Sequence, residues 1–242
     1  MLRPRIPREA LFSLAYRASS VASRLDLTRF GIEVVRVDWD ESLALADAAF
    51  VALARRSRLL FVQGWLFDAR PLLVKHSVLV RKTLAFEKSL LDRCRGRIEP
   101  LRGMSEIIVG VHIRHGDYRH FLGGKYHFPI AVYCEQMARF HELVDKSPAE
   151  IAFVICSDEA QENSEFEGFR HLYSGARAAE DMCMLSQCDF IFGPPSTFAL
   201  WASFAGQVPY GMLITPHHQL KVSDFRIAES QMEFPEVEEL LA

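Results

Sequence analysis

Short apolar runs alternate with helix-forming segments from Glu106 almost to the C-terminus of this 242-residue chain, and this alternation constrains the fold more than any other feature. Strands that alternate with helices form βα units, which build parallel sheets. The sequence therefore predicts an α/β fold with a parallel sheet in its C-terminal half. The expected strands are residues 107–113, 151–156, 171–173, 190–192 and 210–214, and the expected helices are residues 129–144, 179–187, 197–204 and 235–241.

The first hundred residues carry a weaker pattern. Apolar runs and helical spacing predict a strand at residues 32–37, a short apolar run at 59–62, a helix at 41–54 and one or two helices over 72–97. Pro100 and Gly103 make residues 98–105 the expected linker. We therefore expect a reduced N-terminal α/β region, residues 1–103, followed by a second domain, residues 104–242.

Composition excludes several classes of protein. Half of the residues are hydrophobic and the net charge is −3, so a basic nucleic-acid-binding surface is not expected. No apolar run is long enough for a transmembrane helix, although the basic N-terminus reads as an amphipathic helix and leaves a peripheral membrane contact open. The five cysteines form no C-x-x-C pair, so we expect reduced thiols in a cytoplasmic protein and no metal site.

The first expected strand of the C-terminal half ends in a dense polar cluster, VGVHIRHGDYRHF, residues 109–121. In open α/β sheets, ligands bind at the carboxyl ends of the strands. Arg114 offers a forked, permanently charged donor that suits a phosphate, and Gly116 lets the backbone turn. The alternative is an ordinary polar turn that contains a structural salt bridge.

Two further strand ends carry polar side chains. Ser157 and Asp158 follow the strand at 151–156 and are expected to face the same crevice, near a ribose or a base. The turn GPPSTF, residues 193–198, precedes a helix that Ser196 can cap. Free amides at that helix start, together with the hydroxyls of Ser196 and Thr197, favour an anion, whereas the alternative is a plain helix cap.

Three segments carry a resemblance to a known family. HIRHGDY, residues 112–118, resembles the H-x-R-R-G-D-Y motif of the α-1,2-fucosyltransferases of glycosyltransferase family 11. EDMCMLSQCDFIFGPPSTFALWASFA, residues 180–205, resembles the family segment D-x-x-x-M-S-x-C…I-x-x-N-S-T-F-S-W-W-A-A. FVICSDE, residues 153–159, resembles its F-S-D-D strand end. The three segments occur in the family's order, which makes the joint match far more specific than any one of them.

The resemblance implies a GT-B type fold with two α/β halves, in which residues 1–103 form the acceptor side and residues 104–242 a Rossmann-like domain that binds the nucleotide-sugar donor. It implies an inverting, metal-independent glycosyltransferase that moves fucose from GDP-fucose to a glycan hydroxyl, with an α-1,2 linkage. The expected partners are therefore a nucleotide-sugar donor and a glycan acceptor. No cofactor and no metal are expected.

The family motifs also assign roles to residues. The expected catalytic residues are Arg114, His115 and Asp117, and the expected nucleotide-binding residues are His112, Arg114, Ser157, Asp158, Asp181, Ser196, Thr197 and Phe198. Asp181 is expected to accept hydrogens from a guanine, or instead to stabilise its helix start. Asp117 serves as a proton acceptor or braces the loop by pairing with Arg119 or a backbone amide.

The sequence departs from the family in two places. His115 replaces the second arginine of the motif, which removes a permanent charge or supplies one that titrates. The family's Gly-rich turn near the N-terminus is not found, because no glycine precedes Gly31. Asp38-Trp39-Asp40 matches a metal-binding D-x-D motif in letters only. Two alternatives stay open: a non-catalytic nucleotide-sugar or glycan-binding remnant, and a transferase of another nucleotide sugar.

Overall fold

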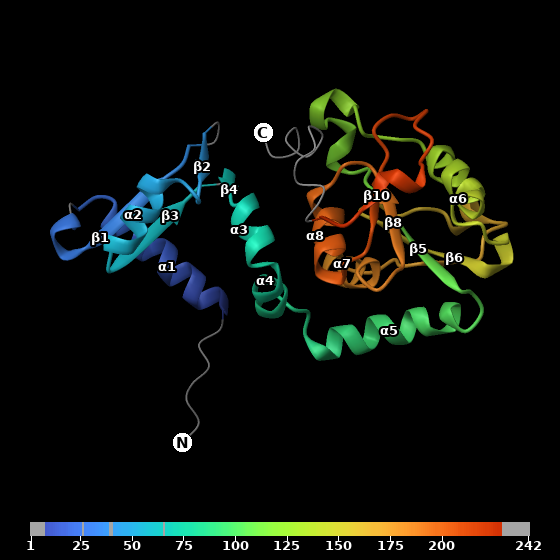
Figure 1. The fold of residues 1–242 in the computed structure, drawn as a ribbon, viewed down its shortest axis with the longest axis horizontal. Coiled ribbons are helices and arrows are strands. Elements are labelled where there is room, and N and C mark those ends of the chain that lie inside the picture. The colour runs from blue at the N-terminus through green and yellow to red at the C-terminus, as the bar shows by residue number, and fades with distance from the viewer. Residues whose placement is uncertain (1–7, 26, 39–40, 65, 229–242) are drawn as a thin grey trace, which may run out of the picture. The chain divides into compact units, whose positions relative to one another are not determined.

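The structure is a computed structural model that describes residues 8–25, 27–38, 41–64 and 66–228. The chain divides into two compact units, Met1–Lys75 and His76–Leu241. Both units are α/β with parallel strands, as expected of a GT-B type chain whose N-terminal half is reduced (Figure 1). The functional division at residue 103, between an acceptor side and a donor side, stays a prediction.

The N-terminal unit contains two pairs of parallel strands, β1 with β3 and β2 with β4. Its elements are α1 (Arg8–Ala22), β1 (Ile32–Arg36), β2 (Ser42–Ala44), α2 (Ala48–Arg56), β3 (Leu59–Gln63), β4 (Leu66–Asp68) and α3 (Arg70–Lys75). The strand at 32–37 is confirmed. The helix predicted over 41–54 is wrong in its first half, because Asp47 caps α2 and accepts bonds from the amides of Ala49 and Phe50 at 2.8 and 3.3 Å.

The expected linker is helical instead. The second unit begins with α4 (Ser77–Thr83) and α5 (Lys88–Arg102), and α5 contains Pro100. Cys94, Ile98 and Leu101 form one buried face of α5, which packs against the sheet domain. Pro100 lies in the last turn, where the missing N–H removes one hydrogen bond and the helix ends two residues later. Burial of this face therefore outweighs the local signal for a break.

The second unit is built on a six-stranded sheet in the order β10-β9-β8-β5-β6-β7, in which only β10 is antiparallel to its neighbour. Its remaining elements are β5 (Ile107–Ile113), α6 (Ile130–Val144), β6 (Ile151–Ser157), β7 (His171–Tyr173), α7 (Ala178–Leu185), β8 (Phe190–Gly193), α8 (Thr197–Gly206), β9 (Tyr210–Met212) and β10 (Phe225–Arg226). The predicted strands are confirmed within two residues at each end. The helix expected at 235–241 lies outside the described residues.

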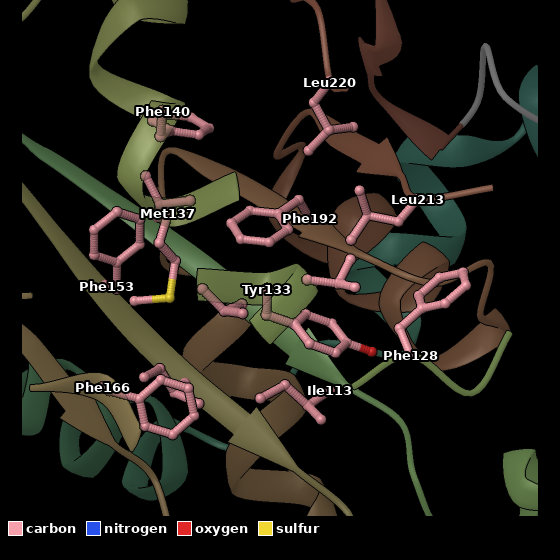
Figure 2. Close-up of a cluster of buried hydrophobic side chains, with 14 of the residues drawn as sticks. Ile113, Phe128, Tyr133, Met137, Phe140, Phe153, Phe166, Phe192, Leu213 and Leu220 are labelled. Atoms are coloured by element: carbon pink, nitrogen blue, oxygen red, sulfur yellow. The ribbon is translucent and has the colours of Figure 1, made fainter. Parts of the chain in front are cut away.

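Side chains of β5 alternate between the two faces of the sheet. Val109, Val111 and Ile113 face α6 and join the aromatic core, in which Figure 2 shows Tyr133 and Phe140 of α6 against the strands. The even-numbered residues face α7 and α8, which cover the other side. The carboxyl end of β5 therefore places His112 and Arg114 on the α7/α8 side of the sheet and His115 on the α6 side.

Within the described ranges, every helix is too short or too polar to cross a bilayer.

Candidate functional site

A pocket of about 200 Å³ opens at the carboxyl ends of β5 and β6. This is the crevice position at which α/β sheets bind ligands. Its walls are the ends of β5 and β6 and the starts of α7 and α8. The lining residues are His112, Arg114, Cys156, Ser157, Asp158, Ala176, Ala178, Asp181 and Phe198. Six of the side chains expected to bind nucleotide, from three separate sequence segments, thus meet in one pocket.

His112 is buried at the end of β5, on the pocket side. Its ring stacks on Phe198 with centroids 5.3 Å apart, and its Nε2 lies 3.1 Å from the hydroxyl of Ser196. Nδ1 has no hydrogen-bond partner among the described residues, although it is buried. Burial lowers the pKa of His112 to about 4, and the nearby Arg114 charge acts in the same direction. The imidazole is therefore neutral at pH 7, and one of its nitrogens is buried without a hydrogen-bond partner among the described residues.

Arg114 also lines the pocket, but two carboxylates hold its guanidinium. Nε pairs with Asp117 at 3.0 Å and Nη1 pairs with Asp158 at 3.2 Å. The guanidinium carbon lies 5.6 Å from the ring centre of Tyr118, within cation–π range. Asp117 thus pairs with Arg114 rather than with Arg119, which pairs with Glu159 at 2.9 Å instead. The expected phosphate donor is therefore compensated in the free protein.

Asp158 has a second set of partners in the turn after β5. Its two oxygens accept bonds from the backbone amides of His115 and Gly116 at 2.8 and 3.1 Å. A Cβ at Gly116 would lie 2.8 Å from Oδ2 of Asp158, so glycine is needed for this close approach. Asp158 therefore braces the turn that carries Arg114, which is a different contact from the ribose or base contact expected from the sequence.

The turn before α8 is tied to the same turn from the other side. The hydroxyl of Tyr118 donates to the carbonyl of Pro195 at 2.6 Å, and burial raises the pKa of Tyr118 to about 12. Ser196 occupies the cap position of α8 but makes no capping bond, because its buried hydroxyl contacts His112 instead. The first intrahelical bond runs from the amide of Leu200 to Ser196 O at 2.9 Å, which leaves the earlier amides of α8 available to an anion.

Asp181 closes the pocket from the first turn of α7. Its carboxylate is buried and accepts a hydrogen bond from the hydroxyl of Ser174, which follows β7. Burial raises the pKa of Asp181 to about 6, and the Ser174 bond only partly opposes this shift. A carboxylate held in this setting is a strong acceptor for paired N–H groups, which fits the expected recognition of a guanine edge.

His115 is separated from the pocket. Its Nε2 lies 2.7 Å from the carbonyl oxygen of Phe128, its Nδ1 lies 3.4 Å from Nε2 of Gln161, and its ring centre lies 4.7 Å from that of His127. These contacts join the turn to the α6 side of the sheet. His115, which stands where the family motif has its second arginine, thus links the turn after β5 to Phe128 and Gln161.

The structure separates the expected site residues into two groups. His112, Arg114, Ser157, Asp158, Asp181 and Phe198 line the pocket, whereas His115, Asp117, Ser196 and Thr197 lie outside its lining. Sequence reasoning gave no role to Tyr118, Gln161 or Ser174. Tyr118 stands inside the HIRHGDY motif and could have been found from it, but no local signal marks the other two. No cluster of three metal-ligand side chains occurs within the described ranges.

The comparison with family models agrees with the motif resemblance. Residues 80–219, more than half of the chain, match the family model of glycosyl transferase family 11. No curated protein matches the chain. Two solved structures of POFUT1, one in complex with GDP and one with GDP-fucose, are each 10% identical in sequence. The first has a TM-score of 0.44 and covers 76% of this chain and 73% of POFUT1; the second has a TM-score of 0.43 and covers 76% and 74%. By its family match, this chain belongs to glycosyl transferase family 11.

Proposed function

We propose that the chain transfers fucose from GDP-fucose to a glycan hydroxyl, with inversion at the anomeric carbon, an α-1,2 linkage and no requirement for a metal ion. Membership of glycosyl transferase family 11 supports a sugar transfer reaction. The GDP-fucose donor rests on the HIRHGDY, FVICSDE and EDMCML…STF motifs together. The pocket at the ends of β5 and β6 is the proposed donor site.

One observation carries this proposal: a neutral histidine, an arginine and a buried carboxylate line one pocket at the strand ends. Arg114 and the early amides of α8 supply positive charge for a leaving diphosphate. His112 stacks on Phe198 in the wall of the pocket, and Asp181 offers a buried acceptor for a base. This division into a diphosphate end and a base end is what a nucleoside diphosphate needs.

The proposed chemistry places stabilisation of the leaving group ahead of base catalysis. Preorganised donors aimed at developing charge supply much of the rate enhancement in such reactions. Asp117 is the motif's candidate proton acceptor, yet in the free protein it pairs with Arg114, and this contact favours a role as a counter-ion of Arg114. His115 is bonded to the Phe128 carbonyl, so its role in this proposal is to hold the turn.

A turnover assay tests the proposal against its two alternatives. The purified chain is incubated with GDP-fucose and a panel of oligosaccharide acceptors, and GDP release and product mass are measured. The proposed function predicts acceptor-dependent GDP release and a fucosylated product, whose anomer and linkage are read by NMR. Binding of GDP without any turnover would favour a non-catalytic remnant. Turnover with a different nucleotide sugar, and none with GDP-fucose, would favour another transferase.

A further inference from the structure

The two carboxylates that hold Arg114 differ in how firmly they are themselves held. Asp117 has a side chain that is 62% exposed, and Arg114 is its one ion-pair partner among the described residues. The Asp158 side chain is only 20% exposed, and it accepts two backbone amides as well as the guanidinium. Both contacts use separate nitrogens of Arg114, so one can open while the other stays closed.

We propose, on the basis of the function proposed above, that Asp117 is a displaceable counter-ion of Arg114, which the donor diphosphate replaces. Asp158 is then the positioning residue that keeps the guanidinium and the turn in place when Asp117 leaves. The free protein keeps its phosphate donor neutralised, and the diphosphate takes over one of the two contacts.

The relative strength of the contacts supports this order of exchange. An exposed ion pair contributes little, because water screens it and both side chains lose freedom. Opening the Asp117 pair therefore costs little, and Asp117 regains full hydration. Displacement of Asp158 would leave two backbone amides without a hydrogen-bond partner, which costs far more free energy than opening the Asp117 pair. A multiply charged diphosphate with bidentate geometry competes well with a single exposed carboxylate but not with the anchored one.

Two substitutions of equal charge change separate this inference from general electrostatics. Asp117→Asn and Asp158→Asn each remove one negative charge near the diphosphate. Charge alone predicts that both bind GDP more tightly. The displaceable counter-ion predicts that Asp117→Asn binds GDP about three-fold tighter, since nothing has to be displaced. The positioning role predicts that Asp158→Asn binds GDP about ten-fold or more weakly, because the Arg114 turn loses its anchor.

Two controls and one further variant belong to the same calorimetric series. Glu159→Gln removes a charge next to Asp158 but affects only the Arg119 pair, and it should change GDP affinity less than about two-fold. Guanosine lacks the diphosphate, so its affinity should be unchanged in both aspartate variants. Gly116→Ala places a Cβ 2.8 Å from Oδ2 of Asp158 and should weaken GDP binding as Asp158→Asn does, even where Asp158→Asn itself folds poorly.

The outcomes are distinct. Tighter GDP binding in Asp117→Asn together with weaker binding in Asp158→Asn and Gly116→Ala supports the inference. Equal or weaker GDP binding in Asp117→Asn overturns the displacement, and equal loss of guanosine and GDP in both Asp158→Asn and Gly116→Ala overturns the positioning role. If the unaltered chain does not bind GDP at all, the proposed function itself fails, which the wild-type titration shows before any variant is compared.

Discussion

The ring of His112 reaches the hydroxyl of Ser196 at 3.1 Å through Nε2, while Nδ1 stays buried without a hydrogen-bond partner among the described residues. When Ser196 donates to Nε2, the hydrogen of the neutral ring lies on Nδ1. The same burial that orients the ring keeps it neutral, with a pKa of about 4. His112 and the buried Asp181 therefore link the binding pocket to the pH dependence of stability.

The two groups act on stability in opposite directions. On folding, the pKa of His112 falls from 6.5 to about 4. The contribution of His112 to the stability of the folded state is therefore complete above pH 6.5 and is lost as the pH falls towards 4. For Asp181 the pKa rises from 3.8 to about 6, so the folded state is relatively stabilised as the pH falls from 6 towards 4. Each shift corresponds to roughly 3 kcal/mol, and the two effects largely cancel between pH 4 and 6.5.

Asp181→Asn should expose this cancellation. The amide keeps an acceptor for Ser174 but carries no buried charge. At pH 7.5 the free energy of unfolding of the variant should therefore exceed that of the wild type by up to about 3 kcal/mol. The difference should shrink as the pH falls below 6, to about one third of that value at pH 4.5, and should approach zero below pH 3.8. Urea unfolding of both proteins at several pH values measures it, because all other titrating groups cancel in the comparison. A difference that stays constant with pH would show that the Asp181 carboxyl has an ordinary pKa.

The same substitution tests recognition of the base. If Asp181 accepts the paired N–H groups of guanine, Asp181→Asn places a donor against a donor and should weaken GDP by about 1 to 3 kcal/mol. ADP should change little, so the GDP-to-ADP affinity ratio falls. Glu180→Gln is the matched control, since Glu180 shares the first turn of α7. An unchanged ratio in Asp181→Asn would leave Asp181 with only a role at the helix start.

Arg114→Ala should weaken GDP by about 2 to 3 kcal/mol, because a charge-assisted contact to phosphate is lost. Arg114→Lys should recover only part of this, since an ammonium cannot reproduce the fork that also reaches Asp158. Arg119→Ala removes an arginine whose partner is Glu159 and serves as the control. Circular dichroism checks that each variant folds. Wild-type affinity in Arg114→Ala would remove the phosphate assignment.

GDP should bind equally well with Mg²⁺ and with EDTA. Arg114 and the amides at the start of α8 supply positive charge for the diphosphate in the proposed site. Titrations under the two conditions, at constant ionic strength, compare the dissociation constants directly. A ten-fold loss on chelation, about 1.4 kcal/mol, would show that a divalent ion takes part in binding.

Local patterns predict much of the sheet domain and half of the site. Alternation along β5 places His112 and Arg114 together on one face and His115 on the other, and this follows from strand geometry alone. The brace from Asp158 to the amides after β5 depends on β6 lying beside β5 with Ile113 opposite Ser157. That register is set by packing of the whole sheet, so no local pattern reports it.

The errors have a common origin. Pro100 and Gly103 signalled a linker, but a buried helical face at Cys94 and Ile98 keeps α5 intact to Arg102. Ser196 signalled a helix cap, but its hydroxyl turns to His112. In both places a tertiary contact outweighs a local preference, which is about 1 kcal/mol for a helix cap and about 3 kcal/mol for a proline inside a helix. The motifs identify which strand ends matter, and the tertiary contacts decide what each side chain does there.

The most direct test of the proposed donor site is calorimetric titration of the intact chain with GDP, ADP and UDP at pH 7.5. One GDP should bind per chain, and ADP and UDP should bind at least about ten-fold more weakly, because Asp181 favours the guanine edge. No heat of GDP binding, or equal affinity for the three nucleotides, would contradict the assignment of this pocket to a guanine nucleotide-sugar.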